Sequence, residues 1–172
     1  MADVKLLAPI IFQWEGGWAD NKIDRGGKTN MGVTLDTWKS CGYDKDGDND
    51  IDENDLKLIT KDDATNLLKK YYWNRCQADL IKSQGIANIL VDWVWASGKW
   101  GIIKTQELLG LVADGLVGAK TINAINSQNE IELFEKIKQA RIDFVENLVK
   151  NHPEQSIFKK GWINRINSFK IV

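Results

Sequence analysis

Glu15 and Asp24 are the two residues whose type and spacing first indicate chemistry. Glycoside hydrolysis commonly uses one carboxylic acid to protonate the leaving oxygen and a second carboxylate across the bond. We expect Glu15 at the C-terminal end of a helix, between Trp14 and Trp18 and followed by two glycines. The negative end of a helix dipole and an apolar neighbourhood both favour a neutral carboxylic acid. Glu15 thus suits a proton donor and Asp24 its partner, but on spacing alone a helix C-cap followed by a polar surface loop is the favoured interpretation.

The residues after Asp24 offer a way to hold the attacking water. The glycine-rich segment RGGKTN, residues 25–30, can turn the chain so that Asp24 faces Glu15. Either the Thr29 hydroxyl or the Asn30 amide could then orient a water molecule. The sequence leaves that choice open.

Four further side chains are candidates for contact with a sugar: Trp18, Asp20, Tyr72 and Trp73. Aromatic rings offer flat apolar surfaces on which pyranose faces can stack. Aromatic residues at helical spacing also serve as core residues, so Tyr72 and Trp73 keep both interpretations.

An acidic segment, DKDGDNDIDEND over residues 44–55, has the spacing of an EF-hand calcium loop. Acids occupy loop positions 1, 3, 5, 7, 9 and 12, namely Asp44, Asp46, Asp48, Asp50, Asp52 and Asp55. Position 8 is the apolar Ile51, and position 6, where EF-hands use glycine, is Asn49, which tolerates positive φ. Asp55 is one methylene shorter than the usual glutamate. We expect a structural Ca²⁺ here, with a solvated acidic hairpin as the alternative.

Composition restricts the class of protein. The 172 residues are 43% hydrophobic and 27% charged, which is typical of one globular domain or one domain with two lobes. Net charge is −1, but seven acids lie in the acidic segment, and the rest of the chain carries 22 basic and 17 acidic residues. That excess suits an anionic polymer such as cell wall or nucleic acid, but an ordinary solvated surface is the favoured explanation. We expect no nucleic-acid partner.

The cysteine content and the lengths of the apolar runs restrict the class of protein further. Cys41 and Cys76 are too few for a zinc site or a disulfide scaffold, and we interpret them as buried thiols, with a single bridge left open. No apolar stretch reaches the ~20 residues that span a bilayer, and the N-terminus lacks a signal-peptide cleavage pattern. We expect a monomer that does not insert into membranes and reaches an external substrate by release or export.

Apolar residues recur at helical spacing almost throughout, and no convincing alternating strand is present, so about eight helices are predicted. The first helix should end at Gly16 or Gly17. Its apolar face is predicted to consist of Leu6, Leu7, Ile10, Ile11 and Trp14. Thr34 and Thr60 are expected to be helix N-caps, and Gly98 and Gly110 are expected to end helices. Ser127 and Glu130 are expected to form a capping box before a long helix.

The motifs together resemble a known family. EGGWADNKIDRGGKTNMGVT is similar to the signature of glycoside hydrolase family 108, a bacterial and phage muramidase family whose members are also labelled secretion activators. DATNLLKKYYWNRC and VDWVWASG resemble the helices that follow in that family. KTQELLGLVADGLVGAKTINAI and FKKGWINRI resemble its C-terminal peptidoglycan-binding part. The resemblance covers nearly the whole chain, in order.

This resemblance implies a mainly α, lysozyme-like, two-lobed fold with the EF-hand-like loop as an insertion. It implies a catalytic region over residues 1–98 and a peptidoglycan-binding region over 99–172. The expected activity is hydrolysis of the β-1,4 bond between N-acetylmuramic acid and N-acetylglucosamine, with Glu15 as general acid, Asp24 as second carboxylate, and no cofactor for catalysis. The alternatives are a non-catalytic peptidoglycan-binding protein and a calcium-responsive interaction module.

Overall fold

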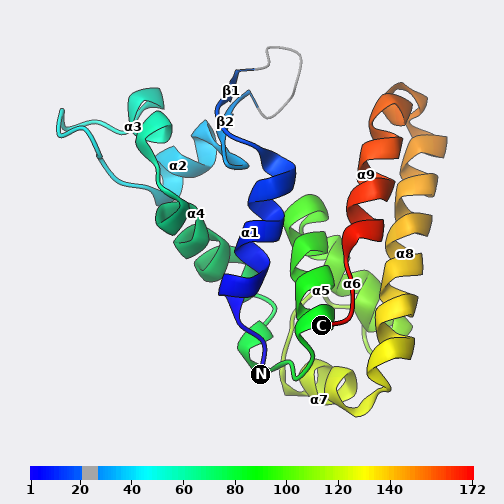
Figure 1. Cartoon of the computed structure of the whole chain (residues 1–172). Coiled ribbons are helices and arrows are strands. Elements are labelled where there is room, and N and C mark those ends of the chain that lie inside the picture. The colour runs from blue at the N-terminus through cyan, green and yellow to red at the C-terminus, as the bar shows by residue number, and fades with distance from the viewer. Residues whose placement is uncertain (21–26) are drawn as a thin grey trace. The chain divides into compact units, whose positions relative to one another are not determined.

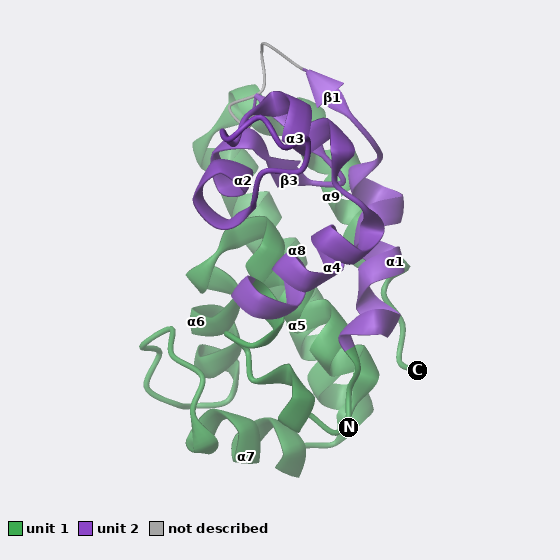
Figure 2. Ribbon diagram, turned by 90° about the vertical axis from the view of Figure 1, so that its left-hand side faces the viewer, with its two compact units in different colours: residues 1–3, 72–172 green, residues 4–71 purple. Residues whose placement is uncertain are grey.

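The computed structural model describes residues 1–20 and 27–172. Within these residues the protein is mainly helical, with nine α-helices and one small three-stranded sheet (Figure 1). The chain divides into two compact units, one formed by residues 4–71 and the other by residues 1–3 and 72–172 (Figure 2). We call them the N-terminal unit and the C-terminal unit.

The N-terminal unit contains α1 (Val4–Glu15), β1 (Ala19–Asp20), β2 (Lys28–Asn30), β3 (Val33–Thr34), α2 (Leu35–Cys41), α3 (Glu53–Leu58) and α4 (Lys61–Leu68). A π-helical turn, η1 (Lys69–Trp73), follows and crosses from the N-terminal unit into the C-terminal unit. The predicted N-caps are confirmed, because the Thr34 and Thr60 hydroxyls accept from the amides of Thr37 and Asp63. The core of this unit is formed by Val33, Trp38, Leu56, Ile59, Ala64 and Leu67.

The predicted apolar face of the first helix is wrong in part. The buried residues of α1 are Val4, Leu7, Ala8 and Ile11. Leu6 and Trp14 are exposed, because the buried stripe follows positions 4, 7, 8 and 11 and turns these two side chains outward. Trp14 is therefore available at the surface of the unit.

The sheet is a difference from the nearly all-helical expectation. Its order is β1-β2-β3, all antiparallel, with Ala19 opposite Thr29 and Asn30 opposite Val33. Met31 and Gly32 form the two-residue turn between β2 and β3 with φ of 49° and 78°. Positive φ at both central positions is typical of a hairpin turn whose twist matches its strands. Strands of two or three residues are too short to show an alternating pattern, so no periodic signal predicts them.

The C-terminal unit contains η2 (Ala78–Leu80), α5 (Gln84–Ser97), α6 (Lys99–Leu108), α7 (Ala119–Ser127), α8 (Glu130–Asn151), η3 (Pro153–Gln155) and α9 (Ser156–Ser168). α5 is buried along residues 85–94, with α6 and α8 packed against it and α9 packed on α8 (Figure 1). Gly101 permits the close approach of α6 to α5, since a Cβ there would lie 2.9 Å from the Val94 nitrogen.

A buried ion cluster joins three helices of this unit. Asp92 of α5 is fully buried, and its carboxylate accepts hydrogen bonds from Arg141 of α8 at 3.0 Å and from Arg165 of α9 at 2.7 Å. Arg141 also donates to the Ile89 carbonyl at 3.1 Å. A buried charge needs such partners, because an unpaired one is costly away from water. Asp92 therefore has a structural role.

Several smaller expectations have clear outcomes. Gly98 caps α5 as predicted, whereas the Ser127–Glu130 capping box is wrong: Asn129 is the N-cap of α8, and its side chain accepts from the Glu132 amide.

Both cysteines are free thiols. Cys76 is fully buried, and burial raises its pKa to about 12, while Cys41 is half-buried. Among the described residues, no helix combines the length and apolar character that a membrane span requires.

Candidate active site

Glu15 is the last residue of α1 and is half-buried. The helix ends there because Gly16 has φ of 73°, a conformation that glycine adopts without a steric penalty. The Gly16 amide still donates to the Phe12 carbonyl at 3.1 Å, which closes the last turn. The predicted helix end is confirmed at Gly16, and it places the Glu15 carboxyl group at the C-terminal end of the helix.

Two indoles flank this helix end. Trp14 and Trp18 are each 38% exposed, although tryptophan is among the side chains that gain most from burial. The ammonium group of Lys57, the residue before the end of α3, lies 5.0 Å from the centroid of the Trp18 ring, within cation–π range. Trp18 therefore offers a positioned and partly exposed aromatic surface three residues from Glu15.

The β2 strand arranges its side chains on two faces of the sheet. Lys28 forms an ion pair with Glu53 of α3, and the Asn30 amide donates to the Leu56 carbonyl at 2.9 Å, so both point toward α3. Asn30 is buried. Because successive side chains of a strand alternate, Thr29 points to the opposite face. Thr29 itself pairs with Ala19 on one side and Thr34 on the other.

Asp20 is exposed in β1, opposite Lys28. Asp24, the expected second carboxylate, lies outside the described residues. Glu15, Trp18, Asp20, Thr29 and Asn30 all belong to the N-terminal unit.

A cavity of about 680 Å³ connects the turn after Glu15 with the hairpin. Gly16 and Gly17 line it from one side, and Asn30 and Met31 from the other. Pro9 and Phe12 of α1 contribute apolar walls. Its volume lies in the range of small-molecule sites, ~300–1,000 Å³.

The two aromatic candidates outside this stretch belong to the C-terminal unit. Trp73 is fully buried, and its indole donates to the Asp79 carboxylate at 2.7 Å, so it is a core residue there. Tyr72 is half-buried, with its ring centroid 4.7 Å from that of Trp95. Of the two, Tyr72 retains exposed surface.

The acidic segment folds into two groups of converging carboxylates, Asp44, Asp46 and Asp48 in one and Asp50, Asp52 and Asp55 in the other. In each group the carboxylate oxygens lie within 4.8 Å of one another. Asn49 has φ of 71°, as expected for loop position 6, and Ile51 packs against the core of the N-terminal unit, as expected for position 8. The described residues of this loop could hold a metal ion.

Local hydrogen bonds and repulsion set the charges of this loop. Asp55 is fully buried, and the backbone amides of Asp52 and Lys45 donate to its carboxylate, which lowers its pKa. Desolvation is the main cause that raises the pKa of Asp46 and Asp50, and repulsion from neighbouring carboxylates raises it further. A bound cation would relieve that repulsion.

α3 connects the acidic loop with the hairpin, which the sequence did not reveal. Asp52 of the loop is the N-cap of α3, and its side chain accepts from the Asn54 amide. At the other end, the Leu56 and Lys57 carbonyls accept from Asn30. The two hydrogen bonds of Asn30 join residues more than twenty positions apart, for which a single sequence carries no pattern.

A carboxylic acid at a helix end, exposed indoles beside it and a hydroxyl-bearing hairpin are groups that a glycoside hydrolase could use. Residues 8–98 match the glycosyl hydrolase 108 family, and the chain belongs to that family. Residues 101–167 match a predicted peptidoglycan domain. Together the two matches indicate a glycoside hydrolase that acts on the peptidoglycan of the cell wall.

A solved structure shares the fold of this chain. The chain resembles SagA of Brucella abortus with a TM-score of 0.77 and 28% sequence identity, over 95% of this chain and 89% of that one. No curated protein matches the chain.

Proposed function

We propose that the protein is an N-acetylmuramidase, which hydrolyses the β-1,4 bond between N-acetylmuramic acid and N-acetylglucosamine in peptidoglycan. The observation that carries this proposal is the position of Glu15 at the end of α1, beside the exposed Trp14 and Trp18. The family match supports the reaction class, and the peptidoglycan match supports the substrate.

In the proposed mechanism, Glu15 protonates the glycosidic oxygen as the bond breaks. Asp24 acts as the second carboxylate, which either stabilises the developing positive charge or activates water. Trp18 stacks on a pyranose ring, and Asp20 contacts the polar edge of the sugar. Tyr72, which belongs to the C-terminal unit, is proposed as a separate contact to the glycan. Trp73 is left out of this proposal because its indole is buried and bonded to Asp79.

We assign the water-orienting role to Thr29 rather than Asn30. The Asn30 amide nitrogen already donates to two carbonyls of α3, whereas alternation along β2 turns the Thr29 hydroxyl to the other face. A hydroxyl can both donate to and accept from a water molecule. Asn30 then acts as the residue that fixes the hairpin.

The remaining parts of the proposal concern organisation. Residues 1–98 carry catalysis and residues 99–172 carry binding to the wall, in a monomer that reaches its substrate by release or export. The acidic loop holds one structural Ca²⁺, and catalysis itself uses no cofactor. The converging carboxylates of the loop and its anchoring by Ile51 support the structural role.

Substitution of the proton donor tests the activity. Glu15→Gln keeps the size of the side chain but removes its acid, and we expect about 10²–10⁴-fold slower release of reducing ends from purified peptidoglycan. Glu135→Gln, an exposed change on α8, is the matched control and should match the wild type. Undiminished activity of Glu15→Gln would overturn the assignment.

The identity of the bond requires a second measurement. Products are reduced with borohydride and analysed by mass spectrometry, and a muramidase leaves reduced N-acetylmuramic acid at the new ends. Reduced N-acetylglucosamine would instead identify cleavage of the other glycosidic bond. Binding to the wall without any new reducing ends would identify a non-catalytic peptidoglycan-binding protein.

A further inference from the structure

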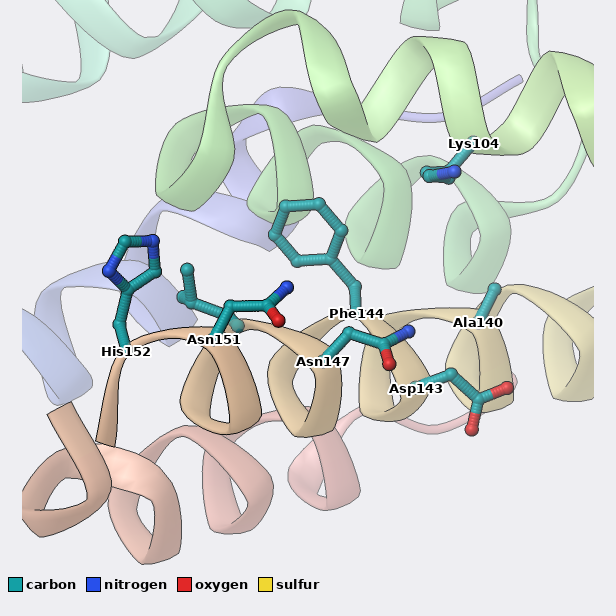
Figure 3. Close-up of a pocket in the computed structure, with 8 residues that line it drawn as sticks. Lys104, Ala140, Asp143, Phe144, Asn147, Asn151 and His152 are labelled. Atoms are coloured by element: carbon teal, nitrogen blue, oxygen red, sulfur yellow. The ribbon is translucent and has the colours of Figure 1, made fainter.

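A surface groove of about 420 Å³ runs along the C-terminal half of α8 in the C-terminal unit (Figure 3). Its polar side chains include Asp143, Asn147 and Asn151, and its apolar ones include Phe144 and Leu148. Every residue that lines it falls within residues 101–167, the stretch that matches a predicted peptidoglycan domain.

The polar side chains form a row. Asp143, Asn147 and Asn151 are four residues apart, so they lie on one face of the helix at intervals of about 6 Å. Figure 3 shows them along α8, with the Phe144 ring rising from the same helix. That ring meets Trp93 edge-on, with centroids 5.9 Å apart, which fixes the apolar wall of the groove.

The two carboxamides are available to a ligand. Within the described part of the chain, neither Asn147 nor Asn151 has a side-chain hydrogen bond, and both are exposed. Each carboxamide offers two donors and one acceptor oxygen. Asp143 is held by Gln139, whose amide donates to it at 2.9 Å.

This chemistry suits a neutral saccharide. Hydroxyl and acetamido groups both donate and accept, so they pair with carboxamides, while the apolar face of a pyranose packs on an aromatic and aliphatic strip. The groove is lined by one acid, Asp143, one base, Lys104, and the imidazole of His152, which lies 3.4 Å from the Glu154 carboxylate, so it has no strong excess of either charge to select an ionic polymer. The volume is large enough for a small ligand.

We propose that the α8 groove binds the N-acetylated glycan strand of peptidoglycan, through the carboxamides of Asn147 and Asn151 and the apolar wall formed by Phe144. This site is made by residues other than those assigned to catalysis, and it rests on the proposed function for the choice of glycan. It gives the C-terminal unit a defined contact with the polymer.

The test uses full-length Glu15→Gln protein, in which hydrolysis during the binding measurement is expected to be strongly slowed. The soluble β-1,4-linked tetramer of N-acetylglucosamine is titrated while the side-chain amide NMR signals of Asn147 and Asn151 are followed. We expect both signals to shift with the tetramer. We also expect N147A/N151A in the same background to bind purified peptidoglycan about tenfold more weakly, since two hydrogen-bonding groups are lost.

The matched control is Asn123→Ala, which removes an exposed asparagine of α7 outside the groove and should leave the affinity unchanged. Unchanged amide signals, unchanged affinity of N147A/N151A, or signals that shift with a free stem peptide and not with the tetramer would each overturn the proposal. If N147A/N151A fails to fold, the NMR titration alone decides. Because hydrolysis is measured separately on wild type, a failed groove and a failed muramidase give different results.

Discussion

Thr29 and Asn30 are neighbours in sequence and face opposite sides of β2, so substitutions at the two positions should separate catalysis from stability. Thr29→Ala removes the hydroxyl proposed to hold water, and we expect about 10²-fold lower kcat with little change in Tm. Thr29→Ser, which keeps the hydroxyl, should retain most activity. Steady-state kinetics on peptidoglycan and thermal unfolding measure the two effects.

Asn30→Ala should show the opposite behaviour. It leaves the buried carbonyl of Leu56 without its 2.9 Å donor, and loss of such a partner costs about 1–3 kcal/mol of unfolding free energy. Urea unfolding of the variant measures that loss. A stable Asn30→Ala protein with abolished kcat would transfer the water-orienting role from Thr29 to Asn30.

At the scale of elements, Asp63 joins the start of α4 to the acidic loop. Its carboxylate accepts from Lys45 at 2.7 Å, from Tyr43 at 2.8 Å and from the Thr60 amide at 2.8 Å. Burial works to raise the Asp63 pKa, but these hydrogen bonds lower it overall to about 2. The ionised form is therefore favoured in the folded state.

Asp63 should consequently make stability dependent on pH. Because its folded pKa lies below the ordinary value of 3.8, its contribution of about 2 kcal/mol is present above pH ~4 and is lost as pH falls toward ~2. Urea unfolding should show Asp63→Asn less stable than wild type at pH 7, with the difference shrinking between pH ~4 and ~2. Asp62→Asn, on the same turn, is the control. A difference that does not change with pH would contradict this prediction.

Removal of calcium tests the acidic loop as an element. A ligand that binds only the folded state stabilises it, by about 2.7 kcal/mol at a hundredfold excess over Kd. We expect Ca²⁺ to raise Tm and a chelator to reverse the rise, while hydrolysis at 25 °C stays unchanged. Asp46→Asn with Asp48→Asn should abolish the response, and Asp36→Asn, an exposed acid of α2, should not. Hydrolysis that requires Ca²⁺ would favour the calcium-responsive alternative.

The sequence predicted those elements whose signals are local. Thr34, Thr60 and Gly98 were recognised because a cap depends on residues three or four positions away. The sheet was missed because its strands are too short for a periodicity, and the Asn30–Leu56 hydrogen bond because it joins distant residues. Near the candidate site, the helix end after Glu15 was predicted from its glycines, whereas the burial of Trp73 depended on tertiary packing.

At the scale of the whole molecule, the chain pairs a hydrolase match over residues 8–98 with a peptidoglycan match over residues 101–167. If the second stretch holds the polymer while the first cuts it, groove substitutions should matter more on intact walls than on short fragments. On a short fragment, only contacts next to the scissile bond contribute to binding. A long strand can also occupy the α8 groove, which raises its effective concentration at the other site.

We therefore expect N147A/N151A to lower kcat/KM on insoluble peptidoglycan by about tenfold, chiefly through KM, since the lost contacts bind substrate and transition state alike. The same variant should lose much less kcat/KM on a soluble muropeptide dimer, and Asn123→Ala should lose none on either substrate. Initial rates of reducing-end release on both substrates supply the ratio. Equal losses on the two substrates would mean that the groove acts on the chemistry or the fold and not by holding the strand.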